Sequence, residues 1–531
     1  MLLRVIRDIS RFALVKVDQG SSSLQIHRLV QAVIRSQMSE AERLEAQHEV
    51  HKILAAARPR QGETDDPSNW STYEIIWPHL GPSQADECDD PRVRQLLIDW
   101  VRYQWKHGEY EACLNLAQRL KSLWTRQLGV NHPQTLNLQF HIANVLRSQG
   151  RFNEARDLDT YVLDRQREVL GTDHLLTLMT AGSLGADFRA LGEFQAALES
   201  DRQTYETFKE EFGEDYPRTL QSAFNLAVSL RLVGDYSAAR LLDQEVLDRR
   251  RMVLSPDHPY TLGTAVNLAQ DLRAAGAFRE SVELLRATWE GYRLILGPDM
   301  IDTLRAATNL AVSLRKAGEQ SEAMTVAQDT YDRYQRRYGS DSPDTRLCAI
   351  NLACDYAAVG DMPKALALVN DVLGALRASL GDDHPNTLVA ANNLACYLRP
   401  IGRLEEAYGL AEDTLRRMRR KLGEMHPLTL ACAVNLANCL GDSGELATAE
   451  ALERETISKL REVLGHDHPD VLACQAGLAV TLRDAGRDRQ AKELRARILV
   501  DFGRVLGAGH PDAIQLREGQ RINRDLESQQ F

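Results

Sequence analysis

A glycine that returns every 42 residues constrains this chain more than any other feature of its sequence. In the clearest copy, from Thr219 to Pro259, Gly234 separates two stretches that have helical spacing of apolar residues. Ten glycines keep this register without an insertion: Gly108, Gly150, Gly192, Gly234, Gly276, Gly318, Gly360, Gly402, Gly444 and Gly486. Small residues, nearly all alanine, stand five positions after each glycine. Such fixed self-similarity predicts a solenoid of stacked units.

Each unit is expected to contain two helices. The first helix has an apolar stripe made of Ala223, Leu226, Ala227 and Leu230. Gly234 ends this helix, because the position after a helix often needs a left-handed backbone. The second helix ends in a phrase such as G-D-D-H-P-N-T-L at Gly381, whose proline suits the first position of the next helix. We therefore predict an all-α, right-handed superhelical solenoid of about ten antiparallel helix pairs.

Four regions are expected along the chain. Residues 1–38 form a partial winged-helix-like segment, with strands over 11–18 and 24–27 and a helix over 29–38. A segment this small cannot hold its own core, so we expect the earlier part of its domain to be missing or supplied elsewhere. Residues 39–91 form a helical linker, residues 92–506 the repeat array, and residues 507–531 a polar helix that caps its open end.

Aromatic residues recur at helical spacing in the linker, at Trp70, Tyr73 and Trp77, and His79 follows them. They favour helix packing against the first repeat, with an aromatic ligand cage as the alternative.

Composition disfavours several classes of function. The net charge of −11 argues against nonspecific nucleic-acid binding, which requires cationic groups at phosphates. No apolar run reaches the roughly 18 residues of a membrane span, and no secretory signal pattern stands near the start. The eight cysteines form no C-x-x-C pair, which is typical of reduced, packed thiols in a cytoplasmic protein.

No catalytic residue, cofactor or metal is expected from the sequence. The turn histidines His132, His174, His258, His384, His426, His468 and His510 stand at least one repeat apart, too far to share a metal ion. The basic clusters 249–251 and 416–421 lie near ends of second helices, where cations meet the negative end of the helix dipole; phosphate contact is the alternative. No G-x-x-x-x-G-K-[ST] motif holds a nucleotide, and no nucleophile with a partnered base stands out.

Two polar columns on the first helices are the candidate peptide-binding site. Because helical residues turn by about 100°, Asn225 and Arg231 are expected off the apolar stripe, facing the concave surface. Asparagine recurs at Asn225, Asn267, Asn309, Asn351, Asn393 and Asn435. Arginine recurs at Arg147, Arg189, Arg231, Arg273, Arg315, Arg399 and Arg483. Lapses at Ser183, Gly477, Ala357 and Gly441 centre the expected groove on residues 220–440.

The chemistry of both columns suits a peptide. A carboxamide donates and accepts, so asparagine matches a peptide main chain without selecting its side chains. The fixed fork of arginine suits carboxylates. Two alternatives stay open: each asparagine bonds to a neighbouring repeat and fixes the stacking, and each arginine is solvated.

The unit N-L-A-V-S-L-R-L-V-G, residues 225–234, resembles the tetratricopeptide repeat. Its 42-residue period resembles the longer variant of kinesin light chains and many bacterial regulators, although alanine replaces the usual large aromatic of the first helix. The kinesin-light-chain resemblance implies that the asparagine column grips a peptide main chain. The string F-A-L-V…L-Q-I-H-R-L-V-Q-A-V-I-R resembles the winged-helix segment that follows NB-ARC modules. Residues 201–236 are similar to the repeat protein of actinobacterial FxSxx-COOH peptide systems.

These patterns predict a non-enzymatic, cytoplasmic scaffold that binds a peptide or protein segment in its concave groove. We expect it to act in a bacterial regulatory or peptide-system assembly, with no nucleic-acid or membrane partner and with its oligomeric state left open. Two other hypotheses remain. The chain is the sensor half of an NB-ARC type switch whose ATPase part is missing, or it is a purely structural scaffold.

Overall fold

The computed structural model describes residues 15–18, 23–59 and 63–529. The chain separates into two compact units, residues 1–103 and 104–531. Within the described ranges, no helix combines the length and the apolar character that crossing a membrane requires. The second unit is an all-α repeat solenoid, as the sequence predicts.

The first unit begins with a small hairpin. Strands β1 (Val15–Asp18) and β2 (Ser23–Ile26) pair antiparallel, with Val15 opposite Ile26. Helix α2 (Arg28–Gln37) follows, so the predicted order of two strands and a helix is confirmed for these residues, while positions 11–14 and the predicted turn at 19–22 lie outside the described ones. Helix α3 (Glu40–Ala56) starts at a capping box formed by Ser39 and Glu42.

The linker aromatics pack against α5 (Pro91–Lys106), the first helix of the array. They lie on α4 (Trp70–Leu80), which follows η1 (Pro67–Asn69) and precedes η2 (Ala85–Glu87). The ring centroids of Tyr73 and Trp77 are 4.6 Å apart, and those of Trp77 and Trp100 are 6.1 Å apart. The Tyr73 hydroxyl donates to Asp99 at 3.2 Å. Packing, and not a ligand cage, therefore accounts for Tyr73 and Trp77, while His79 is exposed.

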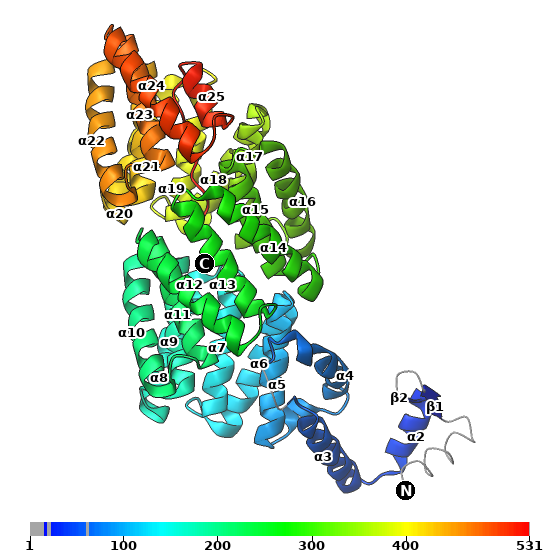
Figure 1. The fold of residues 1–531 in the computed structure, drawn as a ribbon. Helices are drawn as coiled ribbons and strands as arrows, with labels where there is room; N and C mark the ends of the chain where they lie inside the picture. The colour runs from blue at the N-terminus through cyan, green and yellow to red at the C-terminus, as the bar shows by residue number, and fades with distance from the viewer. Residues whose placement is uncertain (1–14, 19–22, 60–62, 530–531) are drawn as a thin grey trace. The chain divides into compact units, whose positions relative to one another are not determined.

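From α5 to α24 the described chain alternates ten first and ten second helices along the sequence, and Figure 1 shows those from α7 to α24, all in the second unit, following one another in order. The first helices after α5 are α7 (Pro133–Ser148), α9 (Leu175–Ala190), α11 (Pro217–Leu232), α13 (Pro259–Ala274), α15 (Ile301–Lys316), α17 (Pro343–Ala358), α19 (Pro385–Leu398), α21 (Pro427–Asp442) and α23 (Pro469–Asp484). The second helices are α6 (Tyr110–Leu128), α8 (Phe152–Leu170), α10 (Phe194–Phe212), α12 (Tyr236–Val253), α14 (Phe278–Leu296), α16 (Gln320–Tyr338), α18 (Met362–Leu380), α20 (Leu404–Leu422), α22 (Leu446–Leu464) and α24 (Asp488–Val505).

The repeating glycine ends each first helix in a left-handed conformation, which confirms the prediction. At Gly234 φ is 91°, and all ten glycines of this column have positive φ. The N–H of Asp235 reaches back to the carbonyl of Leu230 at 3.0 Å, which closes the last turn. A second reason for glycine is close approach: a Cβ on Gly192 would lie 2.4 Å from a ring carbon of Pro385.

The array coils so tightly that successive superhelical turns touch. Four histidine Nε2 atoms meet carbonyls 194 residues earlier: His384 meets Ala190, His426 meets Leu232, His468 meets Ala274 and His510 meets Lys316. Their Nδ1 atoms accept backbone N–H groups and cap the next helix, which confirms the histidines as turn residues. Nε2 therefore holds the proton and donates it. Burial lowers the pKa of His384 and of His426 to about 4.

The predicted capping helix over residues 507–531 is wrong for residues 518–529. Helix α25 (Pro511–Arg517) is short, and residues 520–529, the C-terminal segment, have no regular secondary structure. In Figure 1 this red segment runs from α25 back toward the middle of the array. Ile522 and Leu526 are buried, because the segment packs on other helices and satisfies its polar groups there.

Candidate functional site

The C-terminal segment lies along the first helices, where asparagines hold its main chain. Asn435 on α21 accepts the N–H of Arg524 and donates to the carbonyl of Arg524, both at 2.8 Å. Asn393 on α19 makes the same pair of bonds with Leu526, also both at 2.8 Å. One carboxamide thus satisfies both main-chain groups of one residue in the segment.

The pattern continues into the next repeat. Asn351 on α17 accepts the N–H of Ser528 at 3.2 Å and donates to the Ser528 hydroxyl at 3.0 Å. Asn386, outside the predicted column, accepts the N–H of Gln529 at 2.7 Å and donates to its carbonyl at 3.1 Å. Every second residue of the extended segment, at 524, 526 and 528, therefore contacts a different repeat. The segment runs in the opposite direction to the order of the repeats.

Side chains of the segment add charge pairs. Asp525 accepts from Arg315 Nε at 2.9 Å and from Lys316 Nζ at 2.6 Å. Burial alone would raise the pKa of Asp525, but Lys316 and Arg315 hold it well below its usual range. Glu527 pairs with Arg273 on α13. Because a segment of about ten residues contacts first helices from α13 to α23, this face is concave, and we call it the groove.

The other three predicted asparagines contact their own neighbours. Asn225 accepts from Gln221 at 3.2 Å, and Asn267 accepts from Arg231 at 3.4 Å. Asn309 accepts from Arg273 at 3.1 Å and also donates to a carbonyl of its own helix. The structure therefore divides the column: its later half bonds to the segment, Asn267 and Asn309 make the contacts of the stacking alternative, and Asn225 bonds within its own helix.

The arginine column is not free on the groove surface, which corrects the expectation that it lies off the buried part. Arg189, Arg231, Arg273 and Arg315 are buried. Most of the column reaches a partner on the following first helix: Arg147 bonds Asp187 at 2.6 Å, Arg189 bonds Ser229 at 3.3 Å, Arg231 bonds Asp271 at 3.0 Å, Arg273 bonds Ser313 at 2.9 Å and Arg315 bonds Asp355 at 2.7 Å. The tight coil places each arginine beneath the next repeat.

Arg399 and Arg483 differ from the rest of this column. Arg399 donates to Asn523 Oδ1 at 3.1 Å and pairs with Asp442. Arg483 donates to the carbonyl of Gly519 at 3.0 Å. Together with Arg273 and Arg315, these residues contact the end of the chain as well as the array.

Buried acids opposite the arginines were missed from the sequence. On second helices, Asp159, Asp201 and Asp243 are fully buried and stand 42 residues apart, a register that was visible in the sequence. Burial and the neighbouring Asp271 raise the pKa of Asp243, and Arg231 opposes the rise. Burial raises the pKa of Asp355 to about 6. These pairs hold the array together and leave no exposed acid–base pair for catalysis at these positions.

The basic clusters also have acidic partners. Arg249 pairs with Glu214 and Asp215 in the preceding turn, and Arg417 pairs with Asp383 at 2.8 Å. These ion pairs join one arginine of each cluster to the turn that ends the preceding second helix, a contact that the sequence did not reveal.

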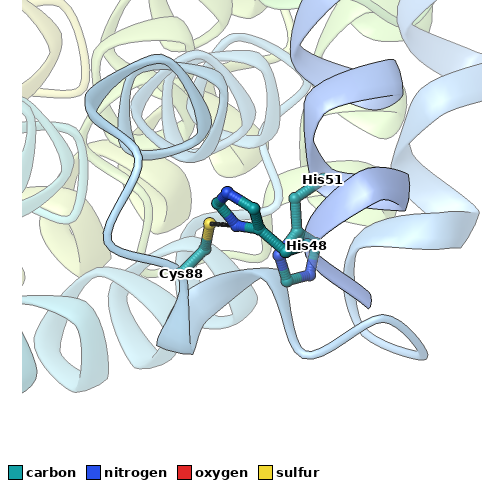
Figure 2. A group of neighbouring side chains, drawn as sticks. All are labelled: His48, His51 and Cys88. Atoms are coloured by element: carbon teal, nitrogen blue, oxygen red, sulfur yellow. Dashed lines mark hydrogen bonds between the residues drawn. The ribbon is translucent and has the colours of Figure 1, made fainter. Parts of the chain in front are cut away.

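Three ligand-type side chains that the sequence analysis did not single out meet in the first unit (Figure 2). His48 and His51 lie one turn apart on α3, and Cys88 Sγ lies 3.8 Å from His48 Nδ1. His51 Nε2 is 2.7 Å from the carbonyl of Ser83. Burial raises the pKa of Cys88, which keeps it in the thiol form. These contacts join α3 to the turn before α5.

Family models match most of the chain. Models described as tetratricopeptide repeat match residues 102–160, 138–210, 188–252, 260–336, 302–378 and 345–416 in one form, and residues 429–470 and 471–512 in another. A domain of unknown function, DUF7779, matches residues 3–43. No curated protein matches the chain.

Solved structures align with parts of the array. One is a kinesin-light-chain-type protein of Podosopora anserina with nearly identical TPR-like repeats, 25% identical over 38% of this chain and 95% of that one, at a TM-score of 0.31. A Rap protein complexed with competence and sporulation factor is 13% identical over 77% and 99%, at 0.45. The apo quorum sensor NprR of B. thuringiensis is 14% identical over 73% and 99%, at 0.45. At these scores the likenesses carry no statement about function.

Proposed function

The chain belongs to the tetratricopeptide repeat family, and we propose that it is a scaffold that captures an extended peptide or protein segment in its groove. One observation carries the proposal: Asn393 and Asn435 each satisfy both main-chain groups of a residue in the C-terminal segment. The array therefore already holds one extended peptide, which is part of its own chain.

The chemistry of this grip depends on the main chain of the bound segment and not on the side chains of the residues that are gripped. Each carboxamide offers one donor side and one acceptor side, as does every residue of an extended main chain other than proline. A net contribution of about 1 kcal/mol per hydrogen bond gives several kcal/mol of binding free energy over Asn351, Asn393 and Asn435. Leaving a buried partner unsatisfied costs about 1–3 kcal/mol more, so substitutions here have large effects.

We place this scaffold in a bacterial regulatory or peptide-system assembly of the cytoplasm. The support is the similarity of residues 201–236 to the repeat protein of FxSxx-COOH systems. The NB-ARC-type switch stays a prediction from residues 1–38.

The purely structural scaffold is the second candidate function, because the segment that fills the groove belongs to the chain itself. In that case the segment never leaves, and no external peptide binds.

Peptide binding is tested with an open-groove variant, the full-length chain with residues 521–528 replaced by alternating glycine and serine. A fluorescent peptide covering residues 519–529 is expected to bind it saturably in an anisotropy titration. Changing Asn351, Asn393 and Asn435 together to alanine in this variant should weaken binding by about 100-fold or more. Asn225→Ala is the matched control, because Asn225 bonds within its own helix.

The thermal unfolding of each variant is recorded beside the titration. If the triple variant unfolds like its parent and binds the peptide equally well, the groove proposal is wrong. If the open-groove variant folds and binds no peptide at all, the structural scaffold is the better account.

A further inference from the structure

Arg147 and Arg231 show the contacts that a column arginine makes at a fixed spacing in the sequence. Arg147 Nη1 lies 3.7 Å from Asp159 Oδ2, 3.3 Å from the carbonyl of Ser183 and 2.6 Å from Asp187 Oδ1. These partners follow Arg147 by 12, 36 and 40 positions. Arg231 contacts partners 12 and 40 positions later in the same way. These arginines thus fill a place bounded by their own second helix and the following first helix.

At Gly441 the column has no side chain, and Arg521 of the C-terminal segment fills that place. Arg521 Nη1 lies 3.2 Å from Glu453 Oε1, 3.2 Å from the carbonyl of Gly477 and 2.8 Å from Thr481 Oγ1. Counted from Gly441, these partners follow by 12, 36 and 40 positions. The guanidinium therefore has the surroundings of a column arginine, although it comes from a distant part of the chain.

Glycine at 441 provides the space for this arrangement. A Cβ on Gly441 would lie 2.2 Å from the central guanidinium carbon of Arg521. Gly441 lies inside α21 and is absent from the positive-φ glycines, so its backbone does not require glycine. The side chain of Arg521 is 1% exposed and also donates to Asp442 at 3.0 Å. The missing side chain, and not the backbone, is what the site uses.

The other column position without an arginine, Ala357, does not have the partners that surround Arg521 at Gly441. Ala357 also lacks the arginine, but the residues 12 and 40 positions later are Val369 and Tyr397, neither of which is an acid. Only the lapse at Gly441 keeps a buried carboxylate, Glu453, which is 1% exposed. A buried carboxylate without a cation is costly, so this site calls for an arginine from elsewhere.

We propose that the site around Gly441 is an arginine socket, and that the groove selects extended segments with an arginine followed four and six residues later by acids. The inference rests on the proposed peptide binding and adds the side-chain pattern of the ligand. The acids meet Arg315 and Lys316, and then Arg273, as Asp525 and Glu527 do. The C-terminal segment has this pattern itself, so it is an internal competitor that a partner segment displaces.

The first test restores the column arginine in the full-length chain. In Gly441→Arg the new side chain enters the contacts that Arg521 makes, so the amides of Arg524 and Leu526 should exchange hydrogen at least about 10-fold faster. Gly409→Arg is the matched control, because Gly409 is an exposed helical glycine with no atom within 4 Å of its Cβ position. Unchanged exchange of α19 and α21 shows that the array is intact. Unchanged exchange of the segment in Gly441→Arg overturns the proposal.

The second test compares ligands on the open-groove variant. The peptide of residues 519–529 should bind at least about 10-fold more tightly than the same peptide with alanine or citrulline at position 521. Equal binding of all three peptides overturns the socket while peptide binding itself stands. Binding of none of them, by a variant whose array is folded, overturns the proposed function as well.

The C-terminal segment is covalently attached to the array and therefore competes with any added peptide in the wild-type chain. A tethered segment acts at an effective concentration on the order of millimolar, so the wild-type chain should bind the added peptide far more weakly than the open-groove variant does. Tight binding to the wild-type chain, equal to that of the open-groove variant, contradicts the role of the segment as a competitor.

Discussion

The earlier and later halves of the groove carry the same asparagine column but use it differently. Asn267 and Asn309 accept from column arginines one repeat before them. Asn393 would receive its arginine from position 357, where alanine stands, and it bonds to Leu526 instead. Asn351 also bonds to the segment, although Arg315 is present one repeat before it and donates to the main-chain carbonyl of Asn351 at 3.4 Å. The arginine lapses, expected to mark the ends of the groove, lie inside its occupied half.

The histidine contacts between superhelical turns hold the two halves together. We expect the largest effect when low pH protonates these histidines and weakens those contacts. The pKa of His384 and of His426 is about 4 in the folded chain and about 6.5 when unfolded, so the unfolded state binds more protons between these values. The stability that these residues contribute is full above pH 6.5 and is lost as the pH falls toward 4. The expected loss is on the order of 3 kcal/mol per histidine.

Thermal unfolding from pH 7.5 to 4.5 measures this loss. The double variant His384→Asn, His426→Asn keeps a helix-capping acceptor and removes the titrating ring. It should show a clearly flatter pH dependence than the wild type. An identical pH dependence would mean that the two histidines do not contribute to it.

Adding an arginine to the later half should make it resemble the earlier half. In Ala357→Arg, we expect the new guanidinium to donate a hydrogen bond to Oδ1 of Asn393, as Arg231 does to Oδ1 of Asn267. Exchange of the Leu526 amide should rise by roughly 10-fold, since one charged hydrogen bond replaces the main-chain pair. Val359→Arg places the same charge on an exposed position nearby and should leave the exchange unchanged.

Removing one asparagine should have different effects on the C-terminal segment in the two halves. Asn267→Ala takes one 3.4 Å acceptor from Arg231 and should cost less than about 1 kcal/mol of stability, with no change in exchange of the C-terminal segment. Asn393→Ala should release the amide of Leu526. Similar exchange of that amide in both variants would remove the distinction between the halves.

The smallest expected effect concerns a partly exposed acid of the segment. Glu527→Gln removes the charge that faces Arg273, and a two- to threefold faster exchange of the Ser528 amide is expected. The difference should shrink as salt is raised, because screening weakens the lost ion pair. A salt-independent difference would point to the shape of the side chain and not to its charge.

The sequence predicted the elements that depend on local spacing. Gly234 and its equivalents end helices as expected, and three of the six column asparagines, Asn351, Asn393 and Asn435, bond to the main chain of the C-terminal segment. The capping helix was expected because residues after Pro511 are polar, yet Asn523 and Asp525 find their partners more than 100 residues away. Periodicity along the chain cannot reveal contacts between a segment and repeats that are distant in sequence.

The burial of the arginines was missed for a related reason. A helical wheel places Arg231 on one face of its own helix, but Asp271 covers it from the next repeat. The 42-residue register of Asp159, Asp201 and Asp243 was the available signal, since an acid repeated on the apolar side of a helix calls for a cation.

Residue-resolved hydrogen exchange along the C-terminal segment of the wild-type chain tests the central claim most directly. The amides of Arg524, Leu526 and Ser528 donate to asparagine carboxamides, whereas within the described chain the amides of Asp525 and Glu527 have no acceptor. The account predicts alternating protection, slow at 524, 526 and 528 and fast at 525 and 527. Uniformly fast exchange, or protection without alternation, would contradict a groove in which asparagines hold an extended main chain.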